Sequence, residues 1–102
     1  MTYENIIFEI EGDVAVIKFN RPKALNAVNI DVVKDIQKAL DEVESNPSVR
    51  VLILTGEGDK AFVAGADISL MVNFTPLQLR EFSVALHELG FRMEGLPIPI
   101  IA

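Results

Sequence analysis

Hydrophobic and polar residues alternate along the first part of the chain. Residues 6–11 and 14–20 place apolar side chains at every second position, with Ile6, Phe8 and Ile10 on one face of the first run and Glu9 and Glu11 on the other. This period is typical of strands that bury one face. A Gly-Asp pair, Gly12-Asp13, separates the two runs, and such a pair favours the tight loop of a β-hairpin. We therefore expect the chain to open with a hairpin.

A helix and a buried strand are expected next. Apolar residues recur every three or four positions between residues 30 and 43, which is the period of an amphipathic helix. Asn29 is suited to cap its first turn, and Asn46-Pro47 ends it. Residues 49–55 are almost continuously apolar. We expect them to form a central strand that is covered on both faces, as in a parallel α/β sheet.

The second predicted helix has the clearest start signal. Thr75 can cap it, Pro76 occupies the first helical position, and Gln78 completes a capping box. Gly95 and Pro97 end it. One apolar stripe runs along this helix and consists of Leu79, Phe82, Leu86, Leu89 and Met93. Another strand is expected over the last residues, so the element order is ββαβαβ and the fold class is α/β with right-handed crossovers.

Length, charge and composition narrow the function classes. The 102 residues contain no repeat or linker, so we interpret residues 1–102 as a single module. Nine basic against fifteen acidic residues give a net charge of −6, which argues against nucleic acid or an anionic membrane as a partner. Zero Cys and one His, His87, argue against Cys nucleophiles and a metal site. No signal peptide or membrane span is visible, so we expect a cytoplasmic protein.

Residues 61–68 are the first candidate for chemistry. Ala64, Gly65 and Ala66 are small and let a ligand approach the backbone. The segment follows a predicted strand, and ligands favour the carboxyl ends of strands in α/β sheets. A helical turn that begins at Ala66 would present free N–H groups to a developing negative oxygen. A plain close-packed turn is the alternative, and Asp67 is either a substrate or base residue or the cap of that turn.

Three segments in this order resemble the enoyl-CoA hydratase (crotonase) family. They are residues 20–27 (NRPKALNA), residues 51–56 (VLILTG) and residues 60–68 (KAFVAGADI). The resemblance extends from about residue 8 to the end of the chain, and the third segment is most similar to bacterial short-chain enoyl-CoA hydratases. It implies the N-terminal ββαβαβ part of the crotonase spiral fold. It also implies reversible hydration of trans-2-enoyl-CoA to 3-hydroxyacyl-CoA in fatty-acid and butyryl-CoA metabolism.

The resemblance also implies the site residues. The backbone N–H of Ala66 corresponds to one of two oxyanion-hole donors. The CoA contacts correspond to Lys23, Ala24 and Leu25 in the first loop and to Ala64, Ala66, Asp67 and Ile68 in the second. No metal and no separate cofactor is implied, because coenzyme A is part of the substrate. Ser69 stands where many members have a lysine, so one cation near the CoA phosphates is missing.

The resemblance further implies that part of the active site lies beyond residue 102. The second oxyanion donor and two catalytic glutamates belong there, so we expect an N-terminal fragment that ends within a strand and is inactive alone. The parent would be a homotrimer or hexamer that binds an acyl-CoA thioester. The open last strand also fits self-association or a non-catalytic binding or assembly module. Because the acid and base residues set the reaction, enoyl-CoA isomerase, hydrolase and decarboxylase stay open.

Overall fold

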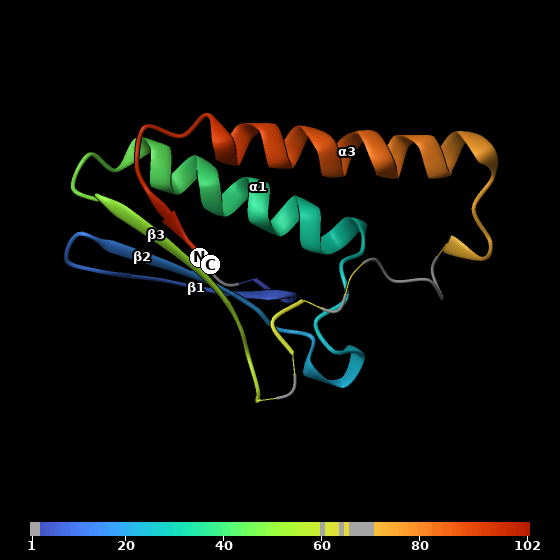
Figure 1. Cartoon of the computed structure of the whole chain (residues 1–102), viewed down its shortest axis with the longest axis horizontal. Helices are drawn as coiled ribbons and strands as arrows, with labels where there is room; N and C mark the ends of the chain where they lie inside the picture. The colour runs from blue at the N-terminus through green and yellow to red at the C-terminus, as the bar shows by residue number, and fades with distance from the viewer. Residues whose placement is uncertain (1–2, 60, 64, 66–70) are drawn as a thin grey trace.

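The computed structural model describes residues 3–59, 61–63, 65 and 71–102. The ββαβαβ order is confirmed (Figure 1). The elements are β1 (Ile6–Glu11), β2 (Val14–Phe19), the 3₁₀ turn η1 (Pro22–Ala24), α1 (Ile30–Ser45), β3 (Val51–Gly56), α3 (Pro76–Glu94) and β4 (Ile100–Ile101).

The four strands form one sheet in the order β1-β2-β3-β4. β1 and β2 form the expected hairpin, with Glu11 opposite Val14 and the loop glycine Gly12 at φ 61°. β2 and β3 are parallel and end level with each other, because Phe19 lies opposite Gly56. β3 and β4 are also parallel. The loops that follow β2 and β3 therefore leave the sheet from the same edge.

α1 and α3 lie on the same side of the sheet, with α1 nearer the strands (Figure 1). α1 packs against β1, β2 and α3. The core consists of inward side chains of the sheet, among them Ile17 and Leu52 at 0% exposure, the apolar face of α1, and Phe82 and Leu89 of α3. The expectation that β3 is covered on both faces is wrong for this chain. Val51 and Ile53 stay partly exposed, because the two helices cover the other face.

The helix starts follow the sequence signals. The side chain of Asn29 accepts a hydrogen bond from the Val32 N–H, and Thr75 and Gln78 form both bonds of a capping box. Each cap pairs backbone N–H groups that a helix leaves unsatisfied at its first turn. The caps therefore fix the residues at which α1 and α3 begin.

Candidate active site

The first loop is a tight turn that places two residues in a left-handed conformation. After η1, Leu25 has φ 53° and Asn26 has φ 58°. This region costs a non-glycine residue roughly 1–2 kcal/mol, although asparagine tolerates it better than leucine does. The turn is closed by hydrogen bonds from the Ala24 and Asn26 N–H groups to the carbonyl oxygen of Arg21, at 2.9 and 2.8 Å. Strained backbone of this kind gathers at functional sites.

The second loop, which follows β3, is bonded to the first loop, which follows β2, at two places. The Asn26 side chain donates to the carbonyl oxygen of Ala61, and the Val28 N–H donates to the carbonyl oxygen of Gly65 at 2.7 Å. Between these points the Phe62 ring packs edge-on against Phe19 of β2, with 5.6 Å between ring centroids. Gly65 has φ 126°, which only glycine adopts readily. The two loops therefore form one connected unit at the carboxyl edge of the sheet.

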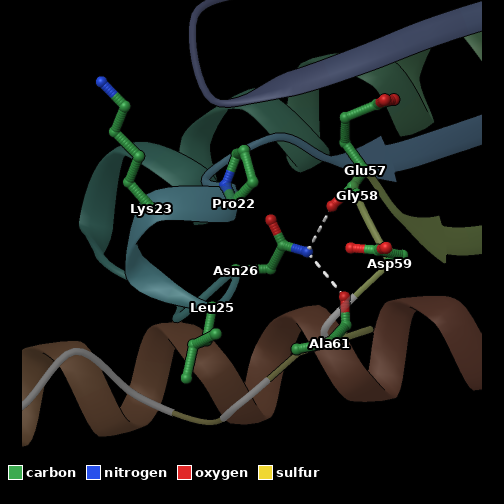
Figure 2. Close-up of a pocket in the computed structure, with 8 residues that line it drawn as sticks. All are labelled: Pro22, Lys23, Leu25, Asn26, Glu57, Gly58, Asp59 and Ala61. Atoms are coloured by element: carbon green, nitrogen blue, oxygen red, sulfur yellow. Dashed lines mark hydrogen bonds between the residues drawn. The ribbon is translucent and has the colours of Figure 1, made fainter.

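A pocket of about 280 Å³ opens between the two loops (Figure 2). Its lining mixes an apolar floor with one cation and two carboxylates. The lining residues are Pro22, Lys23, Leu25, Asn26, Glu57, Gly58, Asp59 and Ala61. In Figure 2 the Lys23 side chain extends away from Asn26. A ligand at this pocket would therefore meet a charged amine at one side and small or apolar groups next to the backbone.

The predicted residues of the first loop lie at this pocket. Lys23 and Leu25 line it, and Leu25 is 46% exposed. Ala24 is partly buried in η1. The structure thus brings the Lys23 and Leu25 positions to the carboxyl edge where a ligand site was expected.

The predicted residues of the second loop lie outside the described residues. These are Ala64, Ala66, Asp67 and Ile68, together with Lys60 and Ser69. Gly65, which precedes Ala66, is described and bonds to Val28. The assignment of Ala66 as an oxyanion donor therefore stays a prediction.

His87 and the carboxylates of α3 lie on solvated faces. His87 is exposed, and so are the α3 carboxylates Glu81, Glu88 and Glu94. Within residues 3–59, 61–63, 65 and 71–102, no three metal-ligating side chains lie together. No helix in that same part of the chain is long and apolar enough to cross a membrane. Among the described residues, the charged groups at the candidate site are therefore Lys23, Glu57 and Asp59.

Sequence reasoning gave no role to Asn26 and Gly56. Asn26 is 1% exposed and bonds to both loops. Gly56 approaches Ala61 and Phe62 so closely that a Cβ would come within 2.6 Å of their carbonyl oxygens. One signal was available, because a glycine directly after an apolar strand indicates close backbone approach. Burial of one loop asparagine has no comparable sequence signal.

Comparisons with known proteins point to one enzyme family. The profile of the enoyl-CoA hydratase/isomerase family matches residues 9–102. Crotonyl-CoA hydratase of Syntrophomonas wolfei is 50% identical, and short-chain-enoyl-CoA hydratase of Clostridium acetobutylicum is 45% identical. Both alignments cover 100% of this chain and 39% of the relative.

A solved structure shows the same fold. The crystal structure of enoyl-CoA hydratase from Bacillus anthracis superposes with a TM-score of 0.91 at 30% sequence identity, over 95% of this chain and 38% of that one. The present chain thus spans about two fifths of the length of the proteins it matches. Since the family profile covers nearly all of its residues, the chain belongs to the enoyl-CoA hydratase/isomerase family.

Proposed function

We propose that this chain contributes the CoA-binding loops and one oxyanion-hole donor to an enoyl-CoA hydratase. The observation that carries the proposal is the pocket between the two loops at the carboxyl edge of a parallel sheet, lined by Lys23 and Leu25. Two relatives that match the whole chain are named as hydratases of crotonyl-CoA and of short-chain enoyl-CoA. Hydratase is therefore favoured over isomerase, hydrolase or decarboxylase.

The proposed chemistry depends on the thioester oxygen. When water adds to the double bond of an enoyl-CoA, its oxygen joins C3, a proton joins C2, and the thioester oxygen carries negative charge in between. A backbone N–H aimed at that oxygen stabilises the transition state by roughly 2.7–4 kcal/mol. Ala66 is the proposed donor, and the small residues around it allow the close approach that this bond needs.

The proton transfers are assigned to groups outside these 102 residues. A general acid or base must lie within hydrogen-bond reach of the reacting atoms. The helix carboxylates Glu81, Glu88 and Glu94 are exposed on α3 and are not among the residues that line the pocket between the loops. We therefore expect the 102-residue chain alone to bind acyl-CoA without hydrating it.

Lys23 is the proposed contact for the phosphate groups of CoA. Its side chain is exposed and lines the pocket, so its ammonium group is accessible to a ligand. Glu57 and Asp59 also line the pocket, so phosphate is expected on the Lys23 side. Coenzyme A is part of the substrate, so no other cofactor is proposed. We further propose that the parent enzyme is a homotrimer or hexamer and that it is located in the cytoplasm.

Titration calorimetry with crotonyl-CoA tests the binding proposal. Lys23→Ala should weaken binding about 2- to 5-fold, because an exposed ion pair contributes up to about 1 kcal/mol. Lys34→Ala, which removes a likewise exposed cation from α1, is the matched control and should leave the affinity unchanged. Wild-type chain that gives no heat with crotonyl-CoA at millimolar concentration would refute the binding proposal.

A hydration assay that follows the ultraviolet absorbance of the enoyl thioester tests the division of the active site. The purified 102-residue chain should give no turnover above background. Turnover by this chain would show that its own residues handle the protons. Light scattering on the same sample measures its oligomeric state. A monomeric mass would contradict self-association through β4.

A further inference from the structure

Asn26 is a buried polar side chain within a surface loop. It is 1% exposed, and the other buried side chains of the described residues are apolar. A buried amide without partners is costly, so the bonds it makes report what holds it there. All of its bonds go to backbone atoms that belong to the two loops of the candidate site.

The bonds of Asn26 join segments that are far apart in the chain. Its Nδ2 donates to the carbonyl oxygen of Glu57 at 3.1 Å and to that of Ala61 at 2.8 Å (Figure 2). Its Oδ1 accepts from the Arg21 N–H at 2.8 Å. Both amide hydrogens are therefore used within the protein. The side chain closes the first loop on itself and fixes the second loop at both ends of a short segment.

Few side chains can replace this set of bonds. Two carbonyl oxygens and one N–H require two donors and one acceptor, which only a carboxamide offers in a planar group. The backbone of Asn26, at φ 58°, also favours asparagine or glycine over other residues. The geometry and the hydrogen-bond pattern select the same residue for independent reasons.

Gly56 supports the same contact from the other side. A Cβ at this position would lie 2.6 Å from the carbonyl oxygens of Ala61 and Phe62 and 2.7 Å from Asn26 Nδ2. Gly56 has no positive φ, so space alone requires a glycine here. The second loop is thus seated directly on the end of β3, within reach of the Asn26 amide.

We propose that Asn26 is a positioning residue that holds the second loop against the first, so that the acyl-CoA site is assembled before the ligand binds. The proposal rests on the proposed function for the identity of the ligand. Val28 provides a separate reporter, because its N–H bonds to the carbonyl oxygen of Gly65, the last described residue before Ala66. If Asn26 positions this loop, its loss should loosen the Val28–Gly65 bond without loosening the sheet.

Amide hydrogen exchange on Asn26→Gly tests the positioning. Glycine keeps the left-handed backbone and removes only the side chain. The protection factor of the Val28 amide should fall about tenfold or more, as expected when a buried hydrogen bond is lost. The amides of Leu52 and Leu54 in β3 should keep their protection factors, apart from any change that global unfolding alone explains. Unchanged protection at Val28 would overturn the proposal.

Asn26→Asp supplies a pH readout that a general packing role would not move. An ionised aspartate has no donor for Glu57 and Ala61, whereas a protonated one can donate to one of them. The surrounding charges, Glu57 and Asp59 against Arg21 and Lys23, stay the same in both variants. Protection at Val28 in Asn26→Asp should therefore rise relative to Asn26→Gly as the pH falls from about 7 to about 4. A constant ratio would contradict the donor role.

Crotonyl-CoA affinity tests the link to the site, with Gly56→Ala as a second variant. Gly56→Ala and Asn26→Gly should each weaken binding about tenfold. A change of this size corresponds to the loss of about one hydrogen bond. Gly90→Ala is the matched control and should bind normally, because a Cβ added to this helix glycine would meet nothing within 4 Å. Normal affinity in a variant whose Val28 protection has fallen would overturn the link. Absence of wild-type binding would instead refute the proposed function, and the exchange data would still decide the positioning.

Discussion

α1 and α3 lie on one side of the sheet, yet they bury very different shares of their apolar side chains. α1 has 16 residues and buries Val32, Val33, Ile36, Ala39, Leu40 and Val43. α3 has 19 residues and buries only Phe82 and Leu89. Its apolar residues Leu77, Val84 and Phe91 are 63%, 44% and 70% exposed.

The difference follows from what each helix packs against. α1 contacts β1, β2 and α3, so its apolar face is covered by the sheet. The exposed α3 residues are spaced seven apart and form a second stripe, away from the buried one. Apolar spacing thus shows which residues form a helix, whereas burial depends on where the neighbouring elements lie.

The largest expected effect comes from the one large aromatic side chain that α3 does bury. Phe82→Ala should lower the free energy of unfolding by about 3–5 kcal/mol, because Phe82 is 2% exposed and packs edge-on against Phe74. Phe91→Ala on the same helix should change it by no more than about 0.5 kcal/mol. Urea denaturation followed by circular dichroism measures both. Similar losses would show that the outer stripe is also packed.

A leucine pair compares the two helices directly. Leu40→Ala in α1 should cost about 2–5 kcal/mol, because Leu40 is fully buried. Leu77→Ala in the first turn of α3 should stay within about 0.5 kcal/mol. A Leu77→Ala loss close to that of Leu40→Ala would remove the contrast between the helices.

Arg92 joins the two helices, and its removal should have a smaller effect. Its guanidinium donates to Asp41 at 2.6 Å, to Glu44 at 3.0 Å and to the carbonyl oxygen of Gln37 at 3.1 Å. Desolvation lowers the Arg92 pKa, but the hydrogen bonds to Glu44 and Asp41 raise it by more, so its pKa lies above the ordinary value.

Because the carboxylates are largely exposed, Arg92→Ala should cost only about 1–1.5 kcal/mol. The loss should shrink in about 1 M salt, which screens the two ion pairs. Exposed Arg80→Ala is the control and should be neutral in the same urea titration. A loss that is independent of salt would assign the effect to alkyl packing instead.

The helix caps give the smallest expected effects. Asn29→Ala and Thr75→Ala should each cost about 0.5–1 kcal/mol, because each leaves N–H groups of a first turn unpaired. The loss at Thr75 should appear as local fraying of α3, visible as faster exchange of the Gln78 amide. Ser83→Ala, an exposed site in the middle of α3, should be neutral. Equal fraying in both helices would show that tertiary packing does not protect α1.

The sequence predicted the features that depend on neighbouring residues. The Gly12 loop and both helix caps involve side chains within a few positions of the backbone they contact. The sequence order of the elements was predicted for the same reason. Leu79 shows the limit, because it continues the predicted stripe of α3 and is nevertheless 42% exposed.

The features that sequence reasoning missed depend on distant contacts. Asn26 becomes informative only when Glu57 and Ala61, more than thirty residues away, are placed beside it. The same holds for the half-covered face of β3, which is set by both helices lying on one side. Lys23 and Leu25 were found through a resemblance, and the structure adds that they share one pocket with Asn26.

The order of strands in the sheet is also the order in which a ribosome makes them. Each strand of β1-β2-β3-β4 pairs with the one synthesised just before it. The nascent chain can therefore form the β1–β2 hairpin first, add β3 once α1 has emerged, and add β4 after α3. None of these four described strands has to wait for a partner among them that is still to be translated, so this part of the family fold suits folding that keeps pace with translation.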